Sequence, residues 1–222
     1  NPDARHHIGV GLTSAITVRV EGSAGYFCAG LSDQAHFEVT HNVGWGVGDN
    51  MYSGSVQVGG NAGAIPGVAI RGAEIVIQGN MGSRAGQVMK AGTLCCAGDA
   101  NFMAGYMMYG GRIIILGDSG ERVGEDMSAG EIFIGGKVQE LGSDAMLSDT
   151  ETSEIEDIRR FLDRYGISFK GSFSKVINAG KKLRYGSNEQ QMRSLPFTSF
   201  SSGSSYWNPK VQEDIVIKSQ SG

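Results

Sequence analysis

Three cysteines are the side chains of this sequence best suited to nucleophilic chemistry. They are Cys28, Cys95 and Cys96, and no Cys-x-x-Cys pair is present. A cysteine becomes a nucleophile only where a positive neighbour lowers its pKa, and adjacent residues of a strand lie on opposite faces, which separates Cys95 from Cys96. We expect three inert thiols in a reducing, cytoplasmic protein rather than a disulfide-stapled secreted one.

The histidines and aspartates form no recognisable metal or acid–base group. The four histidines are His6, His7, His36 and His41. The first two have no cysteine at zinc spacing, and the other two flank a strand and point to opposite faces unless a turn intervenes. Asp99 and Asp118 stand among asparagines, which favours stacked turns over catalysis, with calcium binding as the alternative. We predict no catalytic residue and no metal ligand in this chain.

Close-set glycines at 44–48 (GWGVG) could cradle a phosphate. A dinucleotide-binding fingerprint, however, must follow a strand and open a helix, and no helical pattern follows here. The P-loop pattern GxxxxGK[ST] is absent as well. We therefore predict that this chain alone binds no cofactor.

The 35 glycines among 222 residues recur at a fixed interval instead. A turn column repeats every 19 residues and consists of Gly22, His41, Gly60, Gly79, Gly98, Gly117 and Gly136. Small polar residues follow it, namely Ser23, Asn42, Asn61, Asn80, Asp99 and Asp118. Such residues tolerate left-handed backbone and cap their own turns. A repeat of this length indicates a solenoid, in which each unit stacks on its neighbours.

Apolar columns precede each turn with the period of a strand. Two residues before the turn stand Val20, Val39, Val58, Ile77, Cys96, Ile115 and Ile134, and four before it Val18, Phe37, Val56, Ile75, Leu94, Ile113 and Ile132. A further column contains Met51, Ile70, Met89, Met108, Met127 and Met146. Nineteen residues are too few for a propeller blade, and so many glycines would destabilise helices. We predict an all-β fold, a right-handed parallel β-helix of about seven 19-residue coils.

The outward face of these strands changes from polar to apolar along the chain. Its positions are Arg19, Glu38, Gln57, Val76, Cys95, Ile114 and Phe133. An apolar outer face needs a cover, either this chain's own helix and tail or a partner protein. Phe133 and the corner residues Tyr106 and Tyr109 are therefore candidates for partner contact.

One amphipathic helix is predicted after the coils, over residues 149–165. Its signals are a capping box at Ser153 and Glu156 and a stop at Gly166. An extended pair turning at 178–180 should follow. Beyond it the Ser/Gly-rich composition is typical of a linker, and Pro209 suits a helix start.

We divide the chain into four parts. They are the β-helix over 1–146, the capping helix over 147–166, a basic extended segment over 167–185, and the linker and tail over 186–222.

Charge is distributed unevenly between the body and the tail. Residues 1–165 hold 11 Lys/Arg and 20 Asp/Glu, whereas residues 166–222 hold 8 and 3. A basic tail without an RNA-binding motif favours docking on an acidic protein surface, so Lys181, Lys182 and Arg184 are further candidates for partner contact. No apolar run is long enough for a membrane helix. We expect neither nucleic acid nor membrane as a partner.

The repeats resemble those of a known family. The order strand, G-N-x-G, x-x-x-G, M-x-x-G, as in 75–92 (IVIQGNMGSRAGQVMKAG) and 113–130 (IIILGDSGERVGEDMSAG), is similar to the GXGXG β-helix domain. That domain ends the glutamate synthase large subunit, occurs as a separate subunit in N-methylglutamate-synthase-like complexes, and forms the β-helical subunit of formylmethanofuran dehydrogenase. The segments NPDARHHIGVGL and FSKVINAGKKLRY look most like the stand-alone glutamate-synthase-type subunit.

The resemblance implies a non-catalytic scaffold in a hetero-oligomer. In glutamate synthases a class II glutamine amidotransferase releases ammonia, and a part that contains FMN and an iron–sulfur cluster uses it to aminate a 2-oxo acid. The β-helix joins the two, so the resemblance places FMN and the cluster in partner subunits. The alternatives are a scaffold like the β-helical subunit of formylmethanofuran dehydrogenase and a free-standing β-helix binding module.

Overall fold

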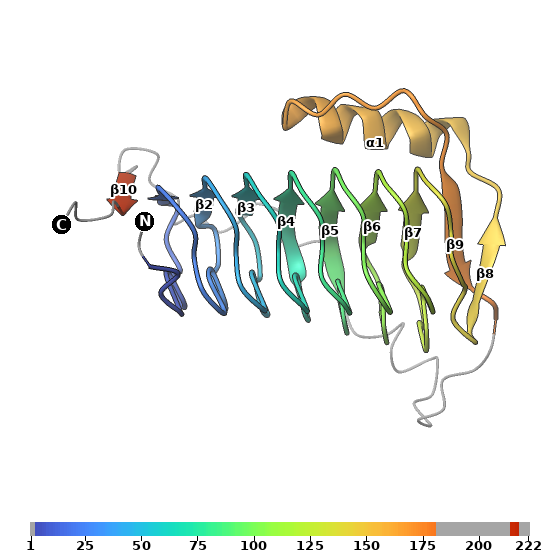
Figure 1. The fold of residues 1–222 in the computed structure, drawn as a ribbon, viewed down its shortest axis with the longest axis horizontal. Helices are drawn as coiled ribbons and strands as arrows, with labels where there is room; N and C mark the ends of the chain where they lie inside the picture. Colours follow the sequence, from blue (N-terminus) through green and yellow to red (C-terminus); the bar gives the residue numbers. More distant parts are fainter. Residues whose placement is uncertain (1–2, 181–213, 218–222) are drawn as a thin grey trace, which may run out of the picture.

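Seven short strands lie side by side along the length of the molecule (Figure 1). The computed structural model describes residues 3–180 and 214–217 of the chain. The strands are β1 (Thr17–Val20), β2 (His36–Val39), β3 (Ser55–Val58), β4 (Arg71–Ile77), β5 (Ala91–Cys96), β6 (Arg112–Ile115) and β7 (Glu131–Ile134). Each is parallel to the next, and from Val18 to Ile132 the residues of one column pair at intervals of 19. The fold is an all-β parallel solenoid of about six turns, as the repeat predicts in outline.

The two predicted apolar columns form the interior of the solenoid. Val20, Ile77 and Ile115 are fully buried, and Val18 is only 2% exposed. The alternation of buried and exposed residues along β1 to β3 is the expected result of one inward and one outward face. The predicted column positions are therefore correct for these strands.

The methionine column holds except at its last member. Met51, Met89 and Met108 are fully buried, whereas Met146 is 45% exposed. Met146 belongs to β8 (Ala145–Ser148), which pairs antiparallel with β9 (Ser174–Asn178) instead of continuing the parallel ladder. The repeat has ended at that point, so the 19-residue spacing no longer places a side chain inside.

The small polar column joins each turn to the next. In each case a side-chain Oδ1 accepts a hydrogen bond of 2.7–2.9 Å from the backbone N–H 19 positions later. The acceptors are Asn42, Asn61, Asn80, Asp99 and Asp118, and the last donor is the N–H of Lys137. The glycine before each donor leaves space for this contact, since a Cβ on Gly79 would lie 2.3 Å from Oδ1 of Asn61. The turn glycines and the small polar residues after them therefore act together to join one turn to the next.

The helix α1 (Thr152–Arg164) lies along the outer face of β4 to β7 (Figure 1). Its buried residues Ile158, Phe161 and Leu162 form a second apolar cluster with the outward side chains of these strands. Over β1 to β3 the outward face is polar, and Arg19 and Glu38 form an ion pair there at 2.6 Å. The change from polar to apolar along the chain thus corresponds to the area that α1 covers.

The helix begins slightly later than predicted. Glu151 is the N-cap in extended conformation, and its N–H donates to the Glu154 carboxylate at 2.8 Å. The predicted capping box at Ser153 and Glu156 is therefore wrong, because the residues after Glu151 already have helical backbone.

No helix of the described residues is long and apolar enough to cross a membrane.

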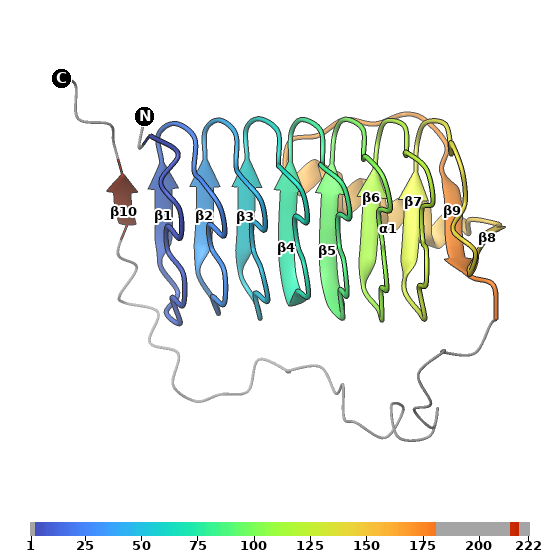
Figure 2. The ribbon, with the colours of Figure 1, turned by 60° about the horizontal axis from the view of Figure 1, so that its bottom comes forward.

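Segments from the C-terminal part of the chain cover both ends of the ladder (Figure 2). β9 pairs with β7 on one side and β8 on the other, and β10 (Asp214–Ile217) pairs in parallel with β1. Of the predicted extended pair turning at 178–180, the first strand is present as β9, and the second lies outside the described residues. The strand at 214–217 lies in a region for which only linker and a helix start were predicted.

Candidate partner-contact surface

The three cysteines are buried, and burial keeps their thiols protonated. Cys28 and Cys96 belong to the interior and Cys95 to the cluster beneath α1, all with no exposed surface. Burial raises the pKa of Cys28 to about 12, and it does the same for Cys95 despite the opposing charge of Arg112. Each thiol therefore stays protonated at neutral pH. This burial agrees with the expectation of inert thiols, and Cys95 and Cys96 do lie on opposite faces.

The histidines that the structure describes have structural partners. The backbone N–H of Tyr26 donates to Nδ1 of His6 at 2.8 Å. Nδ1 of His36 lies 2.9 Å from Oγ of Ser55. Over residues 3–180 and 214–217, no three side chains of the His, Cys, Asp and Glu types are grouped so that they could hold a metal ion.

Glu125 is a buried carboxylate that holds one turn to the next. Its side chain is 7% exposed, and its Oε1 lies 2.7 Å from a guanidinium nitrogen of Arg122. Its Oε2 accepts the N–H of Ser143 at 2.8 Å. Burial alone would raise the pKa of Glu125, but these hydrogen bonds outweigh it and the pKa is lowered. The group stays ionised near neutral pH, which suits a structural anion and not a general acid.

Phe133, a predicted partner contact, lies beneath the chain's own helix. It is fully buried, and its ring meets that of Phe173 edge to face at a centroid distance of 6.3 Å. Lys175 lies over the same ring at 5.7 Å. The prediction is therefore wrong for this residue, because α1 and the segment after it supply the cover.

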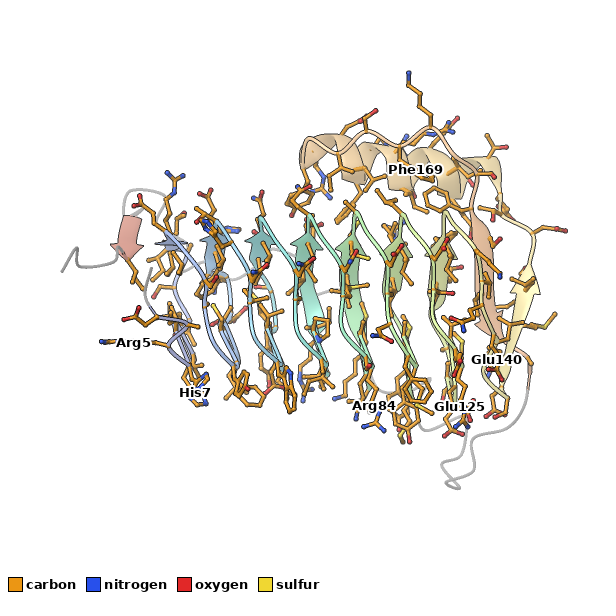
Figure 3. The ribbon with its side chains drawn as sticks, viewed as in Figure 1. Arg5, His7, Arg84, Glu125, Glu140 and Phe169 are labelled. Carbon is orange, nitrogen blue, oxygen red and sulfur yellow. The ribbon has the colours of Figure 1, made fainter. Side chains whose placement is uncertain are left out.

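The two tyrosines predicted as contacts lie on another part of the surface. Tyr109 is 36% exposed, and Tyr106 is half-buried with the guanidinium of Arg84 5.7 Å from its ring centroid. Figure 3 shows Arg84 on the edge of the solenoid that lies away from α1. Their availability to a partner stays a prediction, and Lys181, Lys182 and Arg184 lie outside the described residues.

A row of aromatic residues on the same edge was not predicted. The rings of His6 and Tyr26 stack at 4.3 Å, and those of Tyr26 and Trp45 stack at 5.4 Å. Trp45 is 54% exposed and Tyr26 43%. Figure 3 places His7 on this edge, and His7 stacks on Phe27, the neighbour of Tyr26. We call His6, Tyr26 and Trp45 the aromatic row.

The signal for the aromatic row is present in the repeat. Tyr26 and Trp45 are 19 residues apart, like the members of every other column. Tyr52 and Arg71 show the same spacing, and the guanidinium of Arg71 lies 5.1 Å from the tyrosine ring centroid. The close-set glycines of 44–48 are the most conspicuous feature of this region, so the 19-residue spacing of the aromatic residues is easily overlooked.

The fold places this chain among all-β parallel solenoids, with one helix among its described residues against the outer face. No protein-family model matches it. A stretch of 58 residues is 41% identical to Protein GlxC of Rhizobium meliloti (strain 1021) and covers 26% of this chain and 25% of that protein. The match thus spans about a quarter of the length of this curated relative.

Proposed function

We propose that this chain is a non-catalytic assembly subunit or domain of a glutamate-synthase-type complex. In this proposal it joins a class II glutamine amidotransferase to a part that carries FMN and an iron–sulfur cluster, in the cytoplasm. The product is glutamate or N-methylglutamate. The resemblance of the glycine-rich repeat to the GXGXG domain supports it, and the local match to Protein GlxC agrees with a role related to glutamate synthase.

One structural observation carries the non-catalytic part of the proposal. Among the described residues, the three thiols fill the two cores, and side-chain oxygens such as those of Asn61 and Asp99 accept backbone N–H groups of the next turn. Cysteines that line two separate cores are unsuited to hold an iron–sulfur cluster. We therefore assign FMN and the cluster to partner subunits.

A solenoid suits the task of holding two active sites apart. Ammonia made at one site must reach the second without loss to water, which requires a fixed geometry between them. Each turn of a solenoid buries its core on two neighbours, so the rod resists bending. The aromatic row and Tyr109 are the surface we assign to partner contact, because exposed Trp and Tyr residues dominate many interfaces.

The test is purification of the protein from its native source under mild conditions. Mass spectrometry of co-eluting chains should identify an amidotransferase and a synthase-type subunit, and the complex should show flavin absorbance. Partners of a formylmethanofuran dehydrogenase would favour the alternative scaffold. A colourless chain without partners would refute the assembly role and favour a free-standing binding module.

The contact surface is tested with two matched substitutions. Trp45→Ser should weaken association with the co-purified partners about tenfold or more, as expected for an interface aromatic residue, without lowering the melting temperature. Leu147→Ser is the control, since Leu147 is 51% exposed but lies in β8 at the far end of the ladder. Equal association of the two variants would refute this assignment while leaving the assembly role intact.

A further inference from the structure

The first strand of the ladder has one edge that the coils themselves do not cover. β1 pairs with β2 on one side, and among the described residues no strand of another coil pairs with its other edge. An open strand edge presents unpaired N–H and C=O groups, and proteins normally cover or blunt such edges to avoid self-association. The sequence of β1 (TVRV) contains no proline that would blunt it.

β10 fits this edge in the register of the repeat. Its four residues pair in parallel with β1, from Thr17 with Asp214 to Val20 with Ile217. Beyond the strand, the N–H of Glu21 donates to the carbonyl oxygen of Ile217 at 3.0 Å. β10 pairs with β1 in the same way as β1 pairs with β2, although β10 comes from the C-terminal part of the sequence.

Ile217 also completes the apolar interior at this end. It is half-buried and packs against the interior cluster, as do Ile8, Leu12 and Ile16 of the first coil. Its partner in the register, Val20, is fully buried. The edge therefore selects a strand by main-chain hydrogen bonds and by an aliphatic side chain opposite Val20.

The other end of the ladder is closed more firmly. β9 is paired along both edges, and its Val176 is fully buried. Within the part of the chain that the structure describes, β10 is paired along one edge only, over four residues. Because a short segment held along one edge opens at lower free energy than a strand paired along both edges, β10 should separate from the ladder without unfolding the coils.

We propose that the open edge of β1 is an acceptor site for one extended peptide strand, and that Asp214–Ile217 is its ligand. The ligand class is a strand parallel to β1 with a branched aliphatic residue opposite Val20. Binding through main-chain hydrogen bonds at a sheet edge does not need covalent linkage. The same segment supplied as a separate peptide therefore occupies the site once the chain's own copy is removed.

Two shortened chains test the proposal. One ends after residue 213 and lacks β10, and its control ends after Ile217 and keeps it. Hydrogen exchange of the Glu21 amide, measured by NMR, should be about tenfold faster or more in the first than in the second, because its acceptor is lost. A synthetic peptide of residues 211–222 should bind the first chain one to one and restore the slow exchange.

A second peptide tests the contribution of the Ile217 side chain to binding. The same peptide with Ile217→Ser should bind about tenfold or more weakly, since it loses the aliphatic contact at the end of the core. Equal Glu21 exchange in the two shortened chains, or equal binding of the two peptides, would overturn the proposal. Should the shorter chain fail to fold, the full chain with Ile217→Ser decides, and unchanged Glu21 exchange there would overturn it.

Discussion

A methyl group added at Gly79 should break one link between two turns. Its Cβ would lie 2.3 Å from Oδ1 of Asn61 and 2.9 Å from the carbonyl oxygen of Gly60, closer than such atoms approach without a shift. That Oδ1 accepts the N–H of Asn80 at 2.8 Å. Gly79→Ala must therefore displace the Asn61 amide and lengthen or lose its hydrogen bond.

The expected cost has two parts. Loss of a hydrogen bond at a solvent-accessible position costs about 0.5–1.5 kcal/mol. Crowding against the Gly60 carbonyl adds about 1–3 kcal/mol, the usual range for overpacking. The free energy of unfolding should fall by about 1.5–4.5 kcal/mol in total. In an Asn61→Ala background the cost of Gly79→Ala should be smaller by about 1 kcal/mol, because the displaced amide is already gone.

The assay is urea unfolding followed by circular dichroism, with Gly30→Ala as the matched control. A Cβ on Gly30 would find its nearest atom, the carbonyl oxygen of Phe27, at 3.4 Å, an ordinary contact. Gly30→Ala should be neutral or stabilising by up to about 1 kcal/mol, because alanine reduces the entropy of the unfolded chain. Equal stabilities of the two alanine variants, or additive effects of the two changes at Gly79 and Asn61, would refute the reasoning.

Four further predictions follow from the two cores and the contacts of α1. Ile115→Asp should cost several kcal/mol, since it buries an unpaired charge, and wild-type-like melting would contradict the ladder. Phe133→Ala should cost about 3–5 kcal/mol, where a partner-contact residue would leave the melting temperature unchanged. Cys28 should resist iodoacetamide at pH 8 until urea unfolds the chain, because burial holds its pKa near 12, and fast labelling of the folded protein would refute this. Burial would raise the pKa of Glu154, but the hydrogen bonds from Lys175 and from the Glu151 N–H, together with the positive charge of Lys175, outweigh it and lower the pKa below the usual 4.5. The resulting stability is present above pH 4.5 and is lost as the pH falls through the lowered pKa, and Lys175→Met should flatten that loss in acid-unfolding curves.

The regular part of the fold could be predicted because every turn repeats the same physical constraints. A residue of one column must stack on the residue 19 positions away, so the sequence shows the register directly, as in the pairing of Val18 with Phe37 and of Ile113 with Ile132. The sequence leaves the cover of the outer face open between a helix and a partner. The amphipathic pattern of 149–165 identifies the helix, but a pattern alone does not say which apolar surface it meets.

The parts without a repeat were predicted less well. β8 and β9 pair antiparallel, and no spacing in the sequence relates Met146 to its partner Ile177. β10 is four residues long and pairs with a strand from the opposite end of the chain. A segment so short gives no periodicity, and its structure depends on a free edge that only the assembled ladder provides.

The glycines of the corners reflect packing as much as backbone conformation. Arg84 and Gly86 both have left-handed backbone, with φ of 58° and 67°, yet only the second is glycine. A Cβ on Gly86 would lie 2.5 Å from Cδ1 of Ile113 in the core. Arg84 is exposed and its side chain extends away from the core, so the strain of a left-handed non-glycine residue is tolerated there. Glycine is therefore required in this corner where left-handed backbone coincides with a filled interior, which explains why its spacing is so informative about the core.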